Sequence, residues 1–161
     1  MLERRPAASD DEPFLRALYA TTRPDVAGWE DEAREAFLDL QFRAQQREWG
    51  ARFPDSTHEL ILIDGDAIGR VWVAWRPTEC VIVDLTLLPE QRRSGIGTQI
   101  VRELLADADA RAVPVRVTVE RTNGPSLAFC AGLGFEVVAG DPVYAVLERP
   151  VSKDPRHRAS A

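Results

Sequence analysis

The sequence has few of the residues that cross-link or metallate small proteins. It holds two cysteines and two histidines in 161 residues. Two cysteines cannot build a disulfide framework, and four such side chains make a poor ligand set for zinc. We therefore expect no metal site, and we interpret Cys80 and Cys130 as reduced thiols of a cytoplasmic protein.

Long apolar runs and an excess of positive charge are also lacking. No apolar run approaches the ~18–20 residues that span a bilayer, and the first residues lack the apolar core of a signal peptide. Acidic residues number 26 and basic residues 20, which gives a net charge of −6. This balance argues against a nucleic-acid partner, and the lack of apolar segments argues against a membrane partner.

What the chain does contain is a regular alternation of helical and strand patterns. A first helix follows the capping-box spacing of Ser9 and Glu12 and ends before Pro24. Periods of three to four residues predict further helices at 30–48, 95–111 and 125–131. Alternating patterns predict strands at 2–7, 60–63, 68–75, 80–88, 113–119, 135–138 and 143–147.

The same patterns predict which faces are buried. The helix at 30–48 has one apolar stripe, which consists of Ala33, Phe37, Leu40 and Ala44. Leu38 and Phe42 widen this stripe. One face of the strand at 68–75 should be buried. The strand at 80–88 has two faces, one of which should hold Cys80, Ile82, Asp84 and Thr86.

The order of these elements is an antiparallel meander followed by a strand–helix–strand unit. This order predicts an α+β fold with a mixed, mostly antiparallel sheet flanked by helices. The length fits a single domain. We place that domain at residues 1–149, followed by a polar tail at 150–161.

A buried strand leads into a loop with two arginines and two glycines, and the loop leads into a helix. The loop reads Arg92-Arg93-Ser94-Gly95-Ile96-Gly97-Thr98. The first turn of a helix presents backbone N–H groups without intrahelical acceptors, and the helix dipole adds partial positive charge. Glycines let a ligand approach the backbone, and arginines add charge-assisted contacts. The segment therefore predicts a phosphate site.

Two familiar phosphate loops fit this segment less well. A Walker A loop requires Gly-Lys-Ser or Gly-Lys-Thr, which the segment lacks. The dinucleotide fingerprint requires a third glycine, where this chain has Ile100. A nucleotide-binding domain is therefore our third hypothesis for the function.

The loop resembles the Arg/Gln-x-x-Gly-x-Gly/Ala motif of the GNAT acyltransferases. The whole phrase from Asp84 to Gly97, with Leu-Pro-Glu before the loop, is similar to that superfamily. A second element matches downstream, where the family pattern Asn…Phe-Tyr-x-x-x-Gly-Phe is fitted by Asn123, Phe129, Gly134 and Phe135. The resemblance covers roughly residues 2–149, and the predicted order of elements agrees with the GNAT order.

This resemblance implies acetyl-CoA as the co-substrate and a sheet that splays between its fourth and fifth strands, at Leu87 and Val119. Backbone groups at a bulge around Leu85 and Leu87 would pair with the pantetheine arm. Asn123 would lie near the pantetheine or the pyrophosphate, and Phe129 belongs to the same binding element. The pyrophosphate would be held by Arg92, Arg93, Ser94, Gly95, Ile96, Gly97 and Thr98.

Acyl transfer to an amine requires that the amine first loses a proton. Because an alkylamine has a pKa of about 10.4, deprotonation near pH 7 costs roughly 4.6 kcal/mol. Asp84 is our first candidate for the base, since an acidic residue on this strand has that role in some relatives. Glu120 and Glu79 are alternatives, and Asp84 could instead be a structural carboxylate bonded to backbone or arginine.

The leaving thiolate requires a hydrogen-bond donor or a proton, and here the sequence departs from its family. Cys130 occupies the usual position of a tyrosine. Its side chain is short and its S–H is a weak donor. Cys130 could act as the acid, Tyr144 or water could replace it, or Cys130 could be a packed apolar residue.

In this fold the first two helices and their connection usually border the acceptor site. The connection is acidic and could attract a cationic amine, or it could be a solvated helix face. Its acidic residues are Asp25, Glu30, Asp31, Glu32, Glu35 and Asp39. Tryptophans could shape a pocket or pack in the core, at Trp29, Trp49, Trp72 and Trp75. His58 is either an edge-strand surface residue or a base.

We conclude from the sequence that the chain is an acyl-CoA-dependent N-acyltransferase. It would transfer acetyl from acetyl-CoA to a primary amine of a small molecule or peptide, by direct attack in a ternary complex. The alternative is a non-catalytic acyl-CoA-binding or regulatory module with the same fold, which the cysteine at position 130 favours. A homodimer is compatible with either function.

Overall fold

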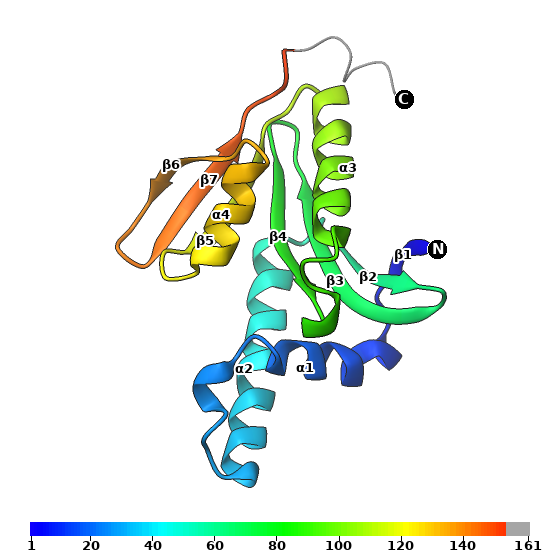
Figure 1. The fold of residues 1–161 in the computed structure, drawn as a ribbon, viewed down its shortest axis with the longest axis vertical. Coiled ribbons are helices and arrows are strands. Elements are labelled where there is room, and N and C mark those ends of the chain that lie inside the picture. The colour runs from blue at the N-terminus through cyan, green and yellow to red at the C-terminus, as the bar shows by residue number, and fades with distance from the viewer. Residues whose placement is uncertain (154–161) are drawn as a thin grey trace. The chain divides into compact units, whose positions relative to one another are not determined.

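The structure is a computed structural model that describes residues 1–153, so the predicted tail at 150–161 lies largely outside the described residues (Figure 1). The helices are α1 Glu12–Ala20, α2 Asp31–Arg52, α3 Ile96–Ala110 and α4 Gly124–Gly132. The strands are β1 Leu2–Pro6, β2 Thr57–Ile63, β3 Asp66–Trp75, β4 Cys80–Leu87, β5 Val115–Glu120, β6 Glu136–Gly140 and β7 Tyr144–Arg149. Short 3₁₀ turns lie at Ser9–Asp11, Pro24–Val26 and Pro89–Gln91.

One sheet contains all seven strands in the order β1-β2-β3-β4-β5-β7-β6. β1 and β2 pair antiparallel, as do β5 with β7 and β6 with β7, whereas β4 and β5 form a parallel pair. The parallel register begins at Cys80 opposite Val115 and ends at Ile82 opposite Val117. The predicted α+β fold, with its mixed, mostly antiparallel sheet, is confirmed.

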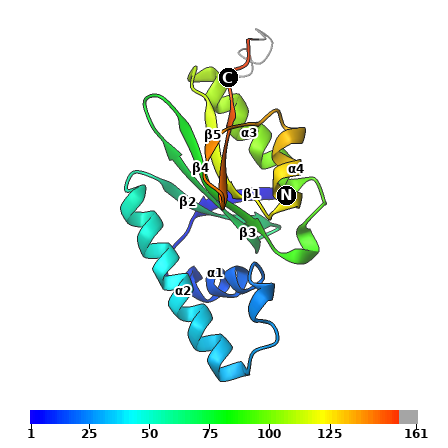
Figure 2. The same cartoon turned by 90° about the vertical axis from the view of Figure 1, so that its left-hand side faces the viewer.

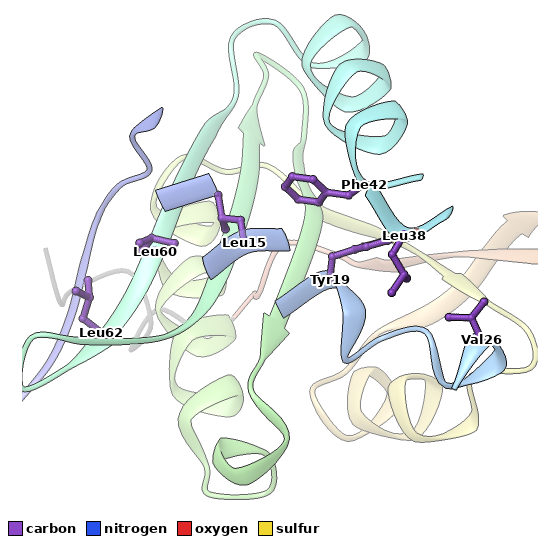
Figure 3. Close-up of a cluster of buried hydrophobic side chains, with 7 residues drawn as sticks. All are labelled: Leu15, Tyr19, Val26, Leu38, Phe42, Leu60 and Leu62. Carbon is purple, nitrogen blue, oxygen red and sulfur yellow. The ribbon is translucent and has the colours of Figure 1, made fainter. Parts of the chain in front are cut away.

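The contacts divide the chain into two compact units, with residues 1–72 and 84–92 in unit 1. α1 lies beside α2 in this unit (Figure 2). Seven buried side chains form its core, drawn in Figure 3, and they come from α1, α2, β2 and the turn between the helices. They are Leu15, Tyr19, Val26, Leu38, Phe42, Leu60 and Leu62.

The buried face of α2 differs from the predicted stripe. Leu38 and Phe42 are each only 2% exposed, but Leu40 is 65% exposed, and Ala33 and Ala44 are also exposed. The helix also continues through Gly50 to Arg52, beyond the predicted end at residue 48. The predicted stripe was wrong because polar glutamines, described below, share the buried face of α2 with its apolar side chains.

The start of α1 also differs from the predicted capping box. The carboxylate of Asp11, one residue before the helix, accepts the Ala8 N–H at 2.8 Å. The same carboxylate accepts two hydrogen bonds from Arg5, at 2.7 and 2.8 Å. The turn before α1 is therefore closed by Asp11 and not by Ser9 and Glu12. The same hydrogen bonds lower the pKa of Asp11 to about 2.

Unit 2 contains residues 73–83 and those from 93 onward. In it, β5 pairs with β7 over six residues. The edge strand β6 lies on the other side of β7, and Figure 1 shows these two strands side by side. The periodicity of 95–111 predicts one apolar stripe on this helix, at Ile96, Ile100, Val101, Leu104, Leu105 and Ala108. α3 buries all of these residues except Ile96, which is only half-buried. At the end of β7, Arg149 donates to the buried Asp109 of α3, with Nη2 at 2.7 Å from Oδ2.

Candidate active site

Strands β3 and β4 are hydrogen-bonded at both ends, but the stretch of β4 between these two pairings is one residue longer than the matching stretch of β3. Near the hairpin, the Arg76 N–H donates to the Glu79 carbonyl at 2.9 Å, and at the far end the Leu88 N–H donates to the Ile68 carbonyl at 2.8 Å. Ile68 and Arg76 are eight positions apart, but Glu79 and Leu88 are nine positions apart. An antiparallel ladder accommodates one extra residue as a β-bulge.

Side-chain directions locate this bulge. The hairpin register places Cys80 and Ile82 on the face of the odd-numbered residues of β3. Asp84, however, accepts a hydrogen bond from Arg70, an even-numbered residue of β3. The bulge therefore lies between Ile82 and Asp84, and not at Leu85 to Leu87 as predicted. It also overturns the prediction that Asp84 and Thr86 share the face of Cys80 and Ile82.

The bulge decides where the backbone of the last β4 residues points. Residues of an antiparallel strand direct their N–H and C=O groups alternately toward and away from the neighbouring strand. Because Leu88 bonds to Ile68, the groups of Thr86 point toward β3, and those of Leu85 and Leu87 point away from it. The parallel pairing with β5 has already ended at Ile82. Leu85 and Leu87 thus direct backbone groups away from β3 beyond the end of the β4–β5 register.

The loop after β4 is anchored by Arg92. Its Nε donates to the Leu87 carbonyl at 2.9 Å, and its Nη2 donates to the Thr21 hydroxyl at 3.0 Å. These bonds hold Arg92 within unit 1 and engage part of the guanidinium that the sequence pattern assigned to phosphate. Arg93 is exposed, and among residues 1–153 the structure gives its side chain no hydrogen-bond or ion-pair partner.

The backbone of the loop turns sharply into α3. Arg93 has φ +60° and Gly95 has φ +87°, both in the left-handed region. Such turns gather successive N–H groups on one concave side and favour an anion. The helical ladder opens with the Gln99 N–H donating to the Gly95 carbonyl at 2.9 Å. The amides of Ile96, Gly97 and Thr98 belong to the first turn, where helices bind anions.

A surface cavity of about 500 Å³ lies beside this turn. Its lining comes from the first three turns of α3 and the residue before it, namely Gly95, Thr98, Gln99, Arg102, Glu103 and Ala106. Gly95 and Thr98 are predicted pyrophosphate-binding residues, so the cavity adjoins the predicted site within unit 2. Arg102 adds a positive charge that the sequence analysis did not single out.

Asp84 is held in a largely buried polar network. Its Oδ2 accepts hydrogen bonds from Arg70 Nε at 2.7 Å and from the Thr86 hydroxyl at 2.9 Å. Arg70 is 3% exposed, and its two Nη atoms each donate at 2.9 Å to Gln46 and Gln45 of α2. This environment matches the structural alternative for Asp84 rather than that of a base.

The two other acidic candidates have different surroundings. Glu79 accepts a hydrogen bond from Arg76 at 3.1 Å and lies 3.4 Å from Arg116, so two arginines neutralise it. Glu120 is exposed at the end of β5, and within the described residues the structure gives its side chain no ion-pair partner. Of the three carboxylates, Glu120 is the one without an arginine contact.

The downstream element places its residues in distinct roles. Asn123 caps α4, with its Oδ1 accepting the Ser126 N–H at 3.2 Å. Cys130 is 7% exposed, and burial raises the pKa of its thiol. Phe129 and Tyr144 are 36% and 43% exposed. The thiol is therefore protonated near neutral pH but hidden, whereas the phenol of Tyr144 is accessible.

Most of the acidic and aromatic side chains proposed for the acceptor site contact other side chains of unit 1. Four carboxylates of the α1–α2 region have arginine partners at 2.7–3.0 Å, namely Asp25, Asp31, Glu35 and Asp39. Trp29 is 47% exposed and packs on Phe37, with ring centroids 5.0 Å apart. These contacts favour a solvated, ion-paired helix face over a dedicated cation site.

The other tryptophans are packed. Trp49 and Trp72 meet edge to face at 5.6 Å, and the Arg70 guanidinium lies 5.3 and 5.9 Å from their ring centroids. In unit 2, Trp75 lies under Arg111. His58 stacks on Trp72 with ring centroids 4.3 Å apart. Burial and the charge of Arg70 lower the pKa of His58 to about 4, so the imidazole is neutral at pH 7.

Arg70, Gln45 and Gln46 could not be found from the sequence, because polar residues on a packed face carry no motif. Gly69 could have been found, because an isolated glycine inside a strand signals a close approach of two backbones. Within residues 1–153, no three histidine, cysteine, aspartate or glutamate side chains gather closely enough to hold a metal ion. Every helix in that range is too short or too polar to span a bilayer.

Comparison with solved structures identifies close matches in fold. PaiA N-acetyltransferase from Thermoplasma acidophilum, in complex with coenzyme A, superimposes with a TM-score of 0.71 at 18% identity, covering 93% of this chain and 99% of that one. The ribosomal-protein-S18-alanine N-acetyltransferase from Escherichia coli gives 0.63 at 16% identity, covering 96% of both chains. A GNAT acetyltransferase from Elizabethkingia anophelis with acetyl-CoA bound gives 0.59 at 11%, covering 92% and 97%.

No curated protein matches the sequence. The fold neighbours that hold coenzyme A or acetyl-CoA are consistent with acetyl-CoA as the co-substrate. The sequence profile of the acetyltransferase (GNAT) family matches residues 15–135, which include β4, the arginine–glycine loop, α3, β5 and α4. The resemblance found in the sequence is thereby confirmed, and the chain belongs to the GNAT acetyltransferase family.

Proposed function

We propose that the chain transfers the acetyl group of acetyl-CoA to a primary amine of a small molecule or peptide, within the predicted domain at residues 1–149. The observation that carries this proposal is the direction of the Leu85 and Leu87 backbone groups. They point away from β3 beyond the end of the β4–β5 register, as an extended pantetheine arm requires. The left-handed turn that would bind the pyrophosphate follows on the same stretch of chain.

The turn at Arg93 to Thr98 would bind the pyrophosphate through backbone amides. The left-handed residues Arg93 and Gly95 and the start of α3 support this role. Arg93 and Arg102 would add charge-assisted contacts from the loop and from the cavity beside it. Arg92 would act mainly by anchoring the loop, because its side chain bonds to Leu87 and Thr21.

The Leu87 N–H would bind the thioester oxygen as negative charge develops on it. The amine nitrogen attacks the acetyl carbon, the carbon–sulfur bond breaks, and the products are the amide and the CoA thiolate. Glu120, or water that it contacts, would take the proton from the amine, since Asp84 and Glu79 are engaged by arginines. Tyr144 or water would protonate the thiolate more readily than the buried Cys130.

The proposal of an amine acceptor is supported by the named activities of two fold neighbours. Two of them are named as N-acetyltransferases, and one of these acts on a ribosomal-protein alanine. Asn123 and Phe129 would contribute to the binding of acetyl-CoA from α4, and Asn123 also caps the start of this helix. The alternative function, an acyl-CoA-binding module without catalysis, is favoured by one observation, the hidden thiol at position 130.

A panel of acceptors separates these two functions. CoA release from acetyl-CoA should be followed with a thiol reagent across alkylamines, amino acids and N-terminal peptides, with Glu120→Gln and the exposed Glu48→Gln as the paired variants. Turnover that falls in Glu120→Gln and persists in Glu48→Gln supports the proposed transferase and its base. Tight acetyl-CoA binding without turnover of any amine favours the binding module. If the protein neither binds acetyl-CoA nor turns over any amine, both the transferase and the binding module are contradicted.

A further inference from the structure

Gly69 lies at the closest approach of β3 to the end of β4. A Cβ at this position would lie 2.7 Å from Leu87 Cδ2 and 3.1 Å from Leu87 Cα, and nearer still to the carbonyl oxygen of Thr86. Real Cβ atoms do not approach other atoms so closely, so any side chain would force one strand to move. The backbone of Gly69 is not left-handed, so the close approach rather than its conformation requires glycine.

Other glycines show how unusual this environment is. Gly28, Gly50, Gly124 and Gly132 have no atom within 4 Å of an added Cβ. An added Cβ at Gly69 would collide with backbone, as it would at Gly140 in unit 2. A backbone carbonyl cannot rotate aside as the end of a flexible side chain can.

The position of the Thr86 carbonyl fixes the direction of the Leu87 N–H, because both belong to one planar peptide. The described chain contains no cis peptide bond, so the two groups point in opposite directions. With the Thr86 oxygen lying against Gly69, the Leu87 N–H points away from β3. The ladder register gives the same direction independently, since Leu88 bonds to Ile68. The other end of Leu87 is held by Arg92.

We propose that Gly69 is a positioning residue for acetyl transfer, because its lack of a side chain lets the Thr86–Leu87 peptide lie against β3 and aim the Leu87 N–H at the thioester oxygen. This inference rests on the proposed function. Gly69 does not touch the substrate itself. It sets the orientation of a donor that acts in the transition state, so its effect should appear in kcat more than in the affinity for CoA.

The test is Gly69→Ala, with Gly50→Ala as the matched control in open space. Removing one oxyanion donor lowers kcat by about 10²–10³-fold, so a displaced donor should lower it at least ~10-fold. The KM for acetyl-CoA and the calorimetric affinity for CoA should stay within ~3-fold, because the pyrophosphate turn is untouched. Gly50→Ala should keep wild-type values. Wild-type kcat in Gly69→Ala, or an equal loss of CoA affinity, overturns the inference.

Two further variants keep the inference testable if Gly69→Ala folds poorly. Leu87→Pro removes the N–H directly and spares the ladder, because that N–H points away from β3. Its kcat should fall by about 10²-fold or more with CoA binding retained. The double variant Gly69→Ala/Leu87→Ala relieves the side-chain contact only and should stay slow. Unchanged kcat in Leu87→Pro, or full recovery in the double variant, overturns the inference, and an inactive wild-type protein overturns the proposed function with it.

Discussion

Arg70 Nε lies 2.7 Å from Asp84 Oδ2, which joins a buried cation on β3 to the carboxylate of β4 that sequence analysis named first as a base. Gln45 and Gln46 of α2 accept hydrogen bonds from the two Nη atoms of the guanidinium, and the rings of Trp49 and Trp72 lie within 6 Å of it. The pair therefore ties α2 to the sheet within unit 1. These contacts occupy the Asp84 carboxylate and favour a structural role for it over that of the base.

Asp84→Asn should lower stability without moving the pH profile of turnover. Loss of the carboxylate charge leaves the buried guanidinium unpaired, which we expect to lower the free energy of unfolding by about 3 kcal/mol. Urea denaturation measures this loss. The control is Glu35→Gln, because Glu35 pairs with Arg16 at an exposed site and should contribute less than about 1 kcal/mol. A shifted pH–rate profile in Asp84→Asn would make Asp84 the base after all.

His58 should make stability fall as the solution is acidified. Its pKa is about 4 in the folded protein against 6.5 in the unfolded chain, so below pH 6.5 the unfolded state binds the proton first. The neutral ring contributes fully above pH 6.5, and this contribution is lost as the pH falls toward 4. His58→Phe keeps a ring for stacking on Trp72 and should flatten the fall in unfolding free energy between pH 6.5 and pH 4. Equal slopes in both proteins would contradict a buried, neutral His58.

Both thiols should resist modification in the folded protein. Cys80 is 0% exposed, and burial raises its pKa to about 12, while Cys130 is 7% exposed with a raised pKa. A disulfide reagent at pH 8 should titrate neither thiol until urea unfolds the chain, and then both. Rapid reaction of either thiol in the folded protein would show an accessible thiolate and contradict its burial. If that thiol were Cys130, it would again be a candidate catalytic group.

Arg93→Glu should weaken the binding of CoA through its phosphates. The substitution places a negative charge at the turn that would hold the pyrophosphate, so the dissociation constant should rise at least ~10-fold, or about 1.4 kcal/mol. Calorimetry with CoA measures the change, and the exposed Arg47→Glu on α2 is the control of equal charge. Equal affinities of the two variants would remove Arg93 from the site.

The fold was largely predictable because most elements follow simple hydrophobic periods. α3 buries the stripe of Ile100 and Leu104 that its spacing of four predicts. α2 was misread because its buried face includes Gln45 and Gln46, whose partner Arg70 lies on a distant strand. Hydrophobicity does not register a polar residue that is buried with its partner.

The site was predictable in its motif and not in its geometry. The glycines of the loop predicted a close approach of a ligand to the backbone, but the left-handed conformations of Arg93 and Gly95 were not predicted. One extra residue in β4 turned Asp84 to the other face, because side chains alternate along a strand. A single inserted residue leaves no pattern in the sequence, so the faces of Asp84 and Thr86 followed only from the hydrogen-bond register.

The central claim is that this chain binds acetyl-CoA through the β4 edge and the turn before α3. The most direct measurement is calorimetric titration of the wild-type protein with acetyl-CoA, repeated as a thermal melt. The account predicts one site per chain and a melting temperature that rises with ligand concentration, equivalent to about 2.7 kcal/mol at 100 times the dissociation constant. No heat of binding and no shift in melting temperature at millimolar acetyl-CoA would contradict it.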